Sequence, residues 1–507
     1  MIYRNILVGL ALLCISLGAC KDVWQDHNEI KDPVLAGTLM EQISGNPELT
    51  KFRDLLIKTG YDKIISSSQT YTVWAPTNAM FDEAVNEVGT SDSLLTQFVG
   101  YHIARQSYFT RMAADTTIRV QTLNGKFIRF TGNGADEAAI LEADQHVGNG
   151  VLHVISQPVV ARKSTWEMFE SLNDGRVTHQ KRFLDAWNVR DFDVEASKQI
   201  GVNPQGLPIY DSVFVDEKGF IASVANLKDE GREFTYFVLT DDVYQQEFNK
   251  LQHYFADSTS EATSFKTQRY IVKDLVVKGS YGAGDLPATM YTLDSTIIAI
   301  DKSAIVASYP ASNGMVHVVN ALSYQMSDKI KPIIVEGERY TQVSDPSVGL
   351  TRRTRKSPDG KVFMDVMNNT HKVNGLWVRY RGNVFSGKYK VYWRMIRDSD
   401  FPLVPAAGAT DLTRFPQKLT WNELWKSTVE GQPVIFDPLA SAGLGYQNEP
   451  VINHNNGTFS PDYSEVYIGD MTIERNGLID LYLVANRTAT AVQNSILLDY
   501  IKLEPIY

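Results

Sequence analysis

Apolar positions in the first part of the chain follow two periods. From Leu35 to Leu56 they recur at helical spacing, which predicts a helix over that stretch. Thr72–Ala75 is β-branched and aromatic and is stopped by Pro76, which predicts a buried strand. Thr77 or Asn78 is expected to cap the helix that follows. The pattern therefore predicts a segment that mixes helices with strands.

Beyond Pro332 the apolar pattern changes to short alternating runs with turns between them. Runs of this length and spacing predict the strands of a β-sandwich. Trp393 lies inside one run, so its ring is expected in the core between the sheets. The runs are Val362–Met367, Leu376–Tyr380, Lys388–Arg394, Glu465–Ile468, Leu478–Val484 and Ser495–Leu503.

Two motifs recur at nearly the same offset. Asn149–Ile155 returns as Asn313–Val319, 164 positions later. Tyr71–Phe81 is matched by Phe234–Tyr244, 163 positions later. Self-similarity at one fixed spacing is the sequence signature of a repeated structural unit. The sequence therefore predicts two copies of one domain.

The order of the motifs in the first copy resembles that of a fasciclin-like domain. Tyr71–Phe81 is similar to the family's strand-to-helix signature, and Asn149–Ile155 is similar to its closing strand. The resemblance implies one such domain over residues 32–161 (repeat 1). It implies a more divergent one over residues 164–326 (repeat 2), in which Leu239 replaces the proline of the signature. It also implies adhesion through protein–protein or protein–glycan contact, with no cofactor.

Repeat 2 holds about thirty more residues than repeat 1 between its opening helix, which begins near Thr165, and its signature. This insertion is expected to include the turn Asn203–Pro208 and the strand-like run Tyr210–Val215. Two interpretations stay open. The insertion carries binding specificity, or it covers the edge of a sheet.

Each copy places one histidine in its second motif, His153 in the first and His317 in the second. A histidine in a buried strand usually makes a fixed hydrogen bond, and neither residue belongs to a sequence cluster of histidines and carboxylates. We therefore expect both histidines to be structural rather than metal ligands.

Residues 1–19 have the positive charge and the short apolar run of a secretory signal peptide. Leu17–Cys20 resembles the bacterial lipobox, which implies lipidation of Cys20 and a lipidated tether over residues 20–31. A plain signal peptide that happens to contain a cysteine is the alternative. Cys14 leaves with the signal peptide, so the mature chain then has no free thiol and no disulfide. Lys21–Asp26 resembles the surface-export signals of lipoproteins in bacteria with SusC/SusD-type uptake systems, which implies display on the outer membrane.

The composition narrows the function further. The chain has 507 residues, of which 43% are hydrophobic and 21% charged, and this is an ordinary globular composition. It has 49 Lys and Arg against 59 Asp and Glu, a net charge of −10, which argues against nucleic acid as a partner. The sequence carries no nucleophile elbow, His-Glu-x-x-His or phosphate-binding glycine loop. We therefore expect no catalytic residue, no metal ligand and no cofactor, and no enzyme.

Trp421 and Trp425 are the candidate ligand-binding residues of the C-terminal segment. We expect them in a longer connection between strands, one helical turn apart. Aromatic faces can stack on the C–H side of sugar rings, whereas packing between the sheets is the alternative for most aromatic residues here. The basic run Arg352–Lys356 is expected to be a solvated loop, with a contact to an anionic partner or membrane surface as the alternative.

Together these observations predict an α+β chain of two tandem fasciclin-like domains followed by an all-β sandwich over residues 332–507. The sandwich resembles jelly-roll modules of the galactose-binding or carbohydrate-binding type. We expect a non-catalytic cell-surface lipoprotein for binding or adhesion, accessory to a SusC/SusD-type outer-membrane complex that takes up glycan or peptide. Its expected partners are the membrane through the lipid, that transporter complex, and a glycan or protein ligand. The alternatives are a cell-envelope adhesin that binds a protein or matrix polymer, and a glycan hydrolase.

Overall fold

The computed structural model describes most of the chain and forms two compact units. One unit comprises the described residues among 37–169, 227–233 and 310–314, and the other comprises those among 170–226, 234–309 and 315–507. The signal peptide, Cys20 and the tether lie outside the described residues, and the domain boundaries given above stay predictions. The described residues are 37–188, 191–192, 198–202, 208–211, 214–215, 219–398, 400–401, 403–429, 432–486 and 495–507.

The helix predicted over Leu35–Leu56 is broken in two. The residues between α3 (Leu39–Gly45) and α4 (Thr50–Thr59) form a short 3₁₀ turn that begins at Pro47, because proline cannot continue the hydrogen-bond ladder of a helix. Thr38 and Glu41 form a reciprocal capping box at the start of α3. The prediction of one continuous helix was therefore wrong.

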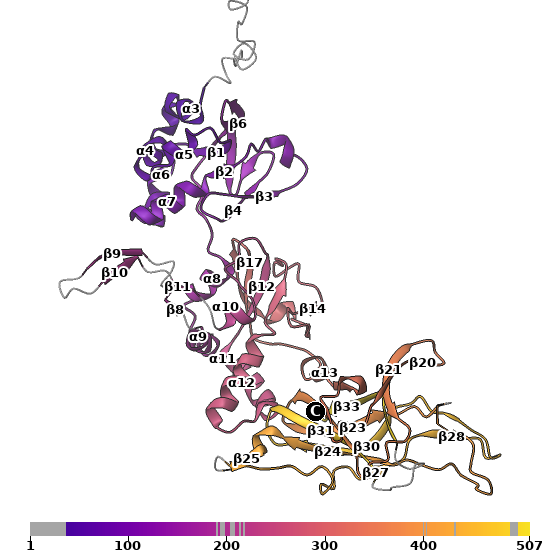
Figure 1. The fold of residues 1–507 in the computed structure, drawn as a ribbon. Helices are drawn as coiled ribbons and strands as arrows, with labels where there is room; N and C mark the ends of the chain where they lie inside the picture. The colour runs from indigo at the N-terminus through magenta and orange to yellow at the C-terminus, as the bar shows by residue number, and fades with distance from the viewer. Residues whose placement is uncertain are drawn as a thin grey trace, which may run out of the picture. The chain divides into compact units, whose positions relative to one another are not determined.

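The predicted strand around Val73 is confirmed and lies inside a sheet, between two other strands. β1 (Tyr71–Pro76) pairs in parallel with β7 (Gly150–Ile155), and all residues of both strands are buried. Val73 packs under the helices, whereas Trp74 packs in a second cluster on the opposite face. A strand that is covered on both faces has apolar residues at successive positions instead of at every second one. In Figure 1 the helices α3 to α7 gather on one side of this sheet.

The elements of repeat 1 build one seven-stranded sheet with the order β2-β1-β7-β6-β5-β4-β3. The remaining helices are α5 (Tyr61–Ile65), α6 (Phe81–Val88), α7 (Asp92–Tyr101) and the 3₁₀ turn η2 (Thr110–Ala113). The remaining strands are β2 (Ile103–Arg105), β3 (Ile118–Gln121), β4 (Phe127–Phe130), β5 (Gly134–Ala135) and β6 (Ala138–Val147).

Neither Thr77 nor Asn78 caps the helix after β1. The Thr77 hydroxyl donates to the Ser156 carbonyl at 2.8 Å, and the Asn78 amide donates to the Pro47 carbonyl at 3.1 Å. The residue that precedes α6 is Met80, which has a left-handed φ of 54° and makes no side-chain capping bond. The predicted cap was wrong because both polar side chains bind neighbouring segments instead.

Repeat 2 reproduces the central strands of repeat 1. Its four-stranded sheet has the order β13-β12-β17-β16, which matches β2-β1-β7-β6. Its opening helix α8 begins at Thr165, as predicted. The elements are α8 (Thr165–Ser171), α9 (Thr178–Trp187), α10 (Phe220–Ser223), β12 (Phe234–Leu239), α11 (Asp241–Leu251), η3 (Gln252–Phe255), α12 (Ser260–Val272), β13 (Val276–Lys278), β14 (Met290–Tyr291), β15 (Ile297–Ile298), η4 (Lys302–Ala304), β16 (Ile305–Ala311), β17 (Gly314–Val319) and α13 (Met326–Lys329).

The insertion in repeat 2 forms two short two-stranded ladders. β9 (Lys198–Val202) pairs with β10 (Pro208–Asp211), and β8 (Asp191–Phe192) pairs with β11 (Phe214–Val215), both antiparallel. Neither ladder joins the four-stranded sheet of repeat 2. The described strands therefore do not extend that sheet, and most of the predicted turn Asn203–Pro208 lies outside the described residues.

The C-terminal segment contains two large antiparallel sheets that share one apolar core. The sheet orders are β18-β33-β23-β30 and β19-β22-β31-β24-β27. Trp393 from the first sheet and Tyr380 from the second are fully buried in this core, as predicted for Trp393. The first sheet comprises β18 (Ile333–Glu336), β23 (Gly387–Arg394), β30 (Val466–Ile473) and β33 (Tyr500–Pro505). The second comprises β19 (Gln342–Val343), β22 (Trp377–Val384), β24 (Gln417–Glu423), β27 (Tyr446–Gln447) and β31 (Gly477–Ala485).

The basic run Arg352–Lys356 is part of a strand and not a solvated loop. It lies in β20 (Thr351–Lys356), which pairs with β21 (Val362–Asn368). Arg353 is buried and donates to Asp365, its partner across the ladder, at 2.9 and 2.6 Å. Arg353 therefore neutralises a buried carboxylate instead of facing solvent. The other elements here are β32 (Ile496–Leu498), which pairs with β21, η5 (Gly337–Arg339), η6 (Leu424–Ser427), β25 (Thr428–Val429), β26 (Gln432–Pro433), β28 (Val451–Asn453) and β29 (Phe459–Pro461).

None of the helices that the structure describes combines the length and the apolar character needed to cross a membrane.

Candidate functional site

The two predicted ligand-binding tryptophans lie in different environments. Trp421 belongs to β24, where it pairs with Leu481 and packs against the C-terminal core. Trp425 lies in η6 and is 37% exposed. The prediction that both occupy a connection one helical turn apart was wrong, because β24 stays paired with β31 as far as Glu423. Trp425 is thus the better placed of the two for an external ligand.

The surroundings of Trp425 limit what it can bind. Its indole N–H donates to Glu423 Oε2 at 2.9 Å, and the Arg475 guanidinium lies over the ring at 3.8 Å. The Glu423 carboxylate also accepts the main-chain N–H groups of Glu474 and Arg475. Burial opposes ionisation of Glu423, but these bonds and Lys426 outweigh it and hold its pKa below the usual value. A sugar that stacks on Trp425 must displace Arg475 or use the opposite face of the ring.

The histidine in the second motif of each repeat is held by hydrogen bonds to main-chain and hydroxyl groups. His153 Nε2 donates to the Tyr108 carbonyl at 2.9 Å, and its Nδ1 accepts the Asp144 N–H at 3.2 Å. His317 Nε2 lies 2.8 Å from the Tyr281 carbonyl and its Nδ1 lies 2.8 Å from the Ser308 hydroxyl. Burial lowers the pKa of both imidazoles. Both ring nitrogens of each histidine are occupied, which supports the structural interpretation.

The asparagine that opens each second motif fixes the start of the repeat. Asn149 Oδ1 accepts the N–H of Leu39, the first residue of α3, at 2.9 Å, and its amide donates to the Ile65 carbonyl. In repeat 2, Asn313 Oδ1 accepts the N–H of Thr165, the first residue of α8, at 2.7 Å. Each carboxamide thus joins the closing strand of its repeat to the opening helix. These asparagines are structural residues and are not available to a ligand.

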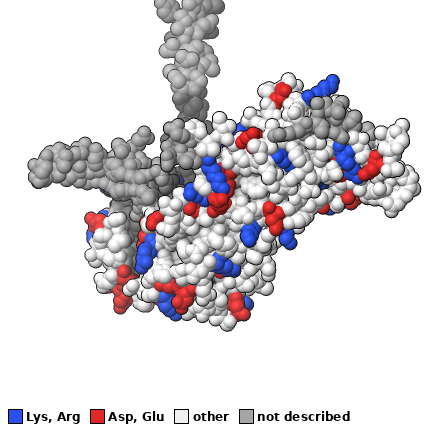
Figure 2. All heavy atoms as spheres, turned by 90° about the horizontal axis from the view of Figure 1, so that it is seen from below, with Lys and Arg blue, Asp and Glu red and all other residues white. Residues whose placement is uncertain are grey.

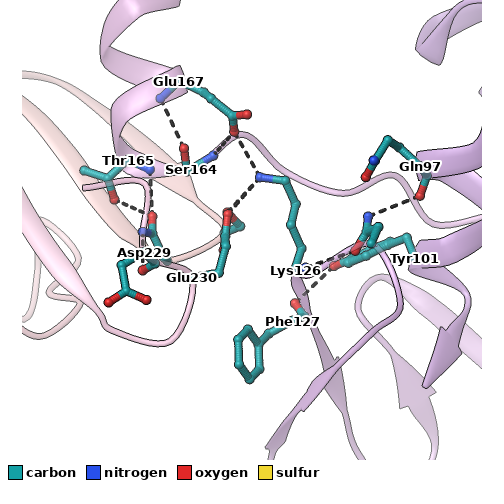
Figure 3. Close-up of polar contacts among 12 residues, drawn as sticks. Gln97, Tyr101, Lys126, Phe127, Ser164, Thr165, Glu167, Asp229 and Glu230 are labelled. Atoms are coloured by element: carbon teal, nitrogen blue, oxygen red, sulfur yellow. Dashed lines mark hydrogen bonds and ion pairs between the residues drawn. The ribbon is translucent and has the colours of Figure 1, made fainter. Parts of the chain in front are cut away.

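Lys126 is the centre of a polar cluster in the first unit. Its ammonium group lies 2.9 Å from Glu167 Oε2 and 2.8 Å from Glu230 Oε1. The same Glu230 oxygen accepts the Ser312 hydroxyl at 2.7 Å. Figure 3 shows the lysine reaching from the strand that holds Phe127 toward both carboxylates. The cluster joins three segments that are far apart in the sequence.

The Glu167 carboxylate of this cluster is an ionised partner of Lys126 and not a proton donor. Burial opposes ionisation of Glu167, but the Ser164 N–H at 2.6 Å and the Lys126 ammonium outweigh it and lower its pKa. Arg119 adds a hydrogen bond to the Glu230 carbonyl at 3.0 Å. The cluster is therefore an electrostatic clasp, defined here as Lys126, Glu167 and Glu230.

A cleft opens in the second unit beside α12. Main-chain bonds hold its two walls together: the Ser386 N–H donates to the Tyr254 carbonyl at 3.0 Å, and the Asn476 N–H donates to the Ala256 carbonyl at 2.8 Å. The cleft has a volume of about 660 Å³. Its apolar lining includes the ring cluster of Phe255, Tyr270 and Phe385, and its polar lining includes Lys266, Arg269, Lys273, Asn383 and Asn476.

Sequence reasoning missed both the clasp and the cleft. Lys126 is one isolated lysine in its stretch of sequence, and Phe255 and Phe385 meet only because the chain folds. One signal was present: Lys266 and Arg269 lie three positions apart in α12, and Lys273, its C-cap residue, continues the same helical spacing.

The charged side chains of the described residues do not form a metal centre. The described residues contain no group of three or more His, Cys, Asp or Glu side chains arranged to hold a metal ion. On the face drawn in Figure 2, Lys and Arg lie among Asp and Glu rather than in one broad basic area. Such a face presents separate charged groups to a ligand.

Comparison with known proteins identifies part of the chain. None of the curated proteins matches it. Among solved structures, the FAS1 domain pair of the insect cell adhesion molecule fasciclin I matches 56% of this chain and 100% of its own, with 17% identity and a TM-score of 0.23. The GH26-CBM35 β-(1,4)-mannanase of Podospora anserina matches 35% of this chain and 28% of its own, with 13% identity and a TM-score of 0.19.

The CBM36-1 domain of a multidomain xylanase from the hindgut metagenome of Trinervitermes trinervoides matches 35% of this chain and 99% of its own, with 16% identity and a TM-score of 0.19. The model of the fasciclin domain family matches residues 47–161. Residues 47–161 of the chain are therefore a fasciclin domain.

Proposed function

We propose that this protein is a non-catalytic lipoprotein of the cell surface that binds a glycan or peptide and serves an outer-membrane uptake complex of the SusC/SusD type. The observation that carries the proposal is the fasciclin domain at residues 47–161. Fasciclin domains are generally involved in cell adhesion, which is compatible with a binding role and requires no reaction centre.

The proposal includes a second fasciclin-like domain over residues 164–326. Its support is the matched geometry of the two repeats. His153 and His317 bind main-chain carbonyls through Nε2, and Asn149 and Asn313 each accept the first N–H of an opening helix. Four strands also follow the same order in both repeats. Shared hydrogen bonds at corresponding positions favour duplication over chance similarity of two short motifs.

The proposal also includes a C-terminal jelly-roll-like β-sandwich as the ligand-binding module. Its support is the pair of antiparallel sheets that enclose one core, with Trp425 partly exposed at their margin. Aromatic rings beside charged and amide groups are the usual means of binding sugars, whose rings have an apolar face and polar edges.

The membrane anchor and the transporter rest on sequence resemblance. Leu17–Cys20 resembles a lipobox, and Lys21–Asp26 resembles a surface-export signal. Several acyl chains anchor a protein firmly, since each buried CH₂ group contributes roughly 0.8 kcal/mol. A binding module held at the outer surface in this way can deliver its ligand to a neighbouring transporter.

A second candidate is a cell-envelope adhesin, and the fasciclin domain favours it as well. The two functions differ in what happens to the ligand: an uptake component captures a soluble nutrient, whereas an adhesin holds a protein or polymer that stays outside.

Binding to whole cells tests the proposed function. Washed cells with and without the gene are incubated with fluorescent glycan and peptide pools, and the retained ligand is eluted and weighed by mass spectrometry. We expect retention only by cells that carry the protein, with the ligand unchanged in mass. Equal retention by both strains contradicts a binding role, and a shortened ligand favours a hydrolase.

A further inference from the structure

We propose that the cleft beside α12 is a binding site for an acidic sugar, with the sugar carboxylate held by Arg269 and the sugar ring packed on Phe385. This inference rests on the binding role proposed above and names the class of ligand. It also places the site away from Trp421 and Trp425, which the sequence suggested.

The size and the apolar wall of the cleft suit a small saccharide. Its volume of about 660 Å³ lies within the range of roughly 300–1,000 Å³ that small-molecule sites occupy. Phe385 is partly exposed and stands at 86° to Phe255 and at 84° to Tyr270, with ring centroids 5.6 and 5.7 Å apart. These edge-to-face contacts fix the orientation of the Phe385 ring. The exposed part of the ring is therefore an apolar surface on which the C–H face of a sugar can pack.

Three cations of α12 and its C-cap line the cleft, but two of them are already neutralised. Lys266 pairs with Asp257 at 2.7 Å, and Lys273 pairs with Asp294. Arg269 is exposed and lies over the Trp187 ring at 5.5 Å. No carboxylate among the described residues forms an ion pair with it. One uncompensated guanidinium therefore remains in the cleft, and its planar donors suit a carboxylate.

Two side-chain amides add groups that can bind sugar hydroxyls. The Asn476 amide nitrogen donates to the Val384 carbonyl at 3.1 Å. The side-chain oxygen of Asn476 can then accept a hydrogen bond from a sugar hydroxyl. Asn383 is exposed at the rim and its side chain makes no hydrogen bond to another described residue. The two amides can bind the hydroxyl groups at the edge of a sugar, and Phe385 can pack on its apolar face.

The number of uncompensated cations in the cleft indicates how much negative charge its ligand carries. A polyanion such as nucleic acid needs several uncompensated cations along its backbone, and this cleft supplies one. A neutral sugar would leave the guanidinium without a partner after its water is displaced, which costs free energy. The arrangement therefore favours a sugar that places a single carboxylate in the cleft, and an acidic peptide is the competing source of that group.

Calorimetric titration of the full-length protein, purified in detergent, tests the assignment. The probes are galacturonate and mannuronate trisaccharides, their methyl esters, and triglutamate. We expect at least one uronate trisaccharide to bind and its methyl ester to bind at least about tenfold more weakly, because a charge-assisted hydrogen bond contributes roughly 1.5–3 kcal/mol.

Variants locate the binding in the cleft. Arg269→Gln is expected to weaken uronate binding by about tenfold or more, and Lys388→Gln, an exposed cation of the same unit that lies outside the cleft lining, is expected to leave it unchanged. Asn383→Ala changes an exposed side chain and serves as a second probe if Arg269→Gln fails to fold. Circular dichroism confirms that each variant is folded.

Three results would overturn the inference. They are absence of uronate binding, equal binding of acid and ester, and uronate binding that survives the cleft variants. Preferential binding of triglutamate would also overturn it, in favour of a peptide site. None of these results touches the whole-cell test, so a wrong ligand class can be told apart from a wrong binding role.

Discussion

Asn149 and Asn313 hold the same position in the two repeats, and each accepts the N–H of the first residue of its opening helix, at 2.9 and 2.7 Å. Each also donates its amide to carbonyls that precede the signature strand, Ile65 in repeat 1 and Leu227 in repeat 2. One side chain thus fixes the helix, the preceding loop and the closing strand together. This asparagine therefore connects the second motif to the opening helix and to the loop before the signature strand.

The buried amide makes repeat 2 sensitive to one substitution. Asn313→Ala leaves the Thr165 N–H without an acceptor and removes one of the two donors at each of the Leu227 and Asp229 carbonyls, so we expect a loss of about 2–4 kcal/mol in the free energy of unfolding. Urea denaturation followed by circular dichroism measures it. Asn249→Ala, on the exposed face of α11, is the control and should stay within about 0.5 kcal/mol. Equal effects of the two variants would contradict the role given to Asn313.

His102 makes the stability of repeat 1 depend on pH. Its Nδ1 donates to the Phe98 carbonyl at 2.9 Å and its Nε2 accepts the Val159 N–H at 3.1 Å, while burial lowers its pKa to about 4. The unfolded chain, with a histidine pKa of about 6.5, therefore binds the proton first. The stability of the folded state is full above pH 6.5 and falls by about 3 kcal/mol as the pH drops toward 4.

Thermal melts of the wild type and of His102→Gln between pH 4 and pH 8 check this dependence. The variant is expected to lose the part of the pH dependence that His102 contributes. His146→Gln, which changes an exposed histidine, should retain it. A His102→Gln profile parallel to that of the wild type would show that His102 is not the titrating group.

Arg353 is expected to be essential for the C-terminal sheets, whereas its neighbour Arg352 is not. Arg353 binds Asp365 through two hydrogen bonds and Asp398 at 3.1 Å, and all three side chains are buried. Arg353→Met leaves the buried Asp365 carboxylate without a cation and Asp398 with Arg355 alone, and it should cost about 3–5 kcal/mol. Arg352→Met removes an exposed charge and should cost less than about 1 kcal/mol. Urea unfolding curves of both variants measure the difference, and similar curves would contradict this account.

Trp421 and Trp425 should differ in what their removal changes. Trp421→Ala deletes a ring packed against the core, so we expect a loss of about 2–4 kcal/mol in unfolding free energy. Trp425→Ala removes a partly exposed ring and should change stability by less than about 1 kcal/mol. Thermal melts compare the two variants. A destabilised Trp425→Ala protein would show that the indole bond to Glu423 is structural.

The clasp in the first unit can be opened without touching the cores. Lys126→Met leaves Glu230, whose side chain is 14% exposed, without its cation. We expect a local loss of about 1–2 kcal/mol, seen as roughly 5–30-fold faster amide hydrogen exchange at residues 164–167 and 230–233. Lys126→Arg should keep most of the protection. Unchanged exchange in Lys126→Met would mean that the clasp contributes no stability.

The sequence predicted those features that depend on local pattern. The strand around Val73 and the strand that holds Trp393 are continuous apolar or alternating runs, and the structure has both. The structural role of His153 followed from its place in such a run. The local sequence also indicates the break between α3 and α4, because Pro47 cannot continue a helix. The prediction missed it because the apolar residues on both sides keep helical spacing.

Features that depend on contacts between distant residues could not be predicted. The sequence alone places Arg353 in an exposed basic run, and only the pairing of β20 with β21 shows that Asp365 lies opposite it. Phe255 and Phe385 line one cleft although 130 positions separate them. Trp421 reads as part of a connection because its pairing partner, Leu481, lies 60 positions away. Periodicity in one sequence carries no information on such partners.

The most direct test of the proposed function is a pull-down from detergent-solubilised outer membranes with the tagged full-length protein at native expression. The account predicts recovery of a transporter of the SusC type and its SusD-type lipoprotein in amounts close to that of the bait. Recovery of the protein alone, or with an extracellular polymer and no transporter, would contradict the uptake role.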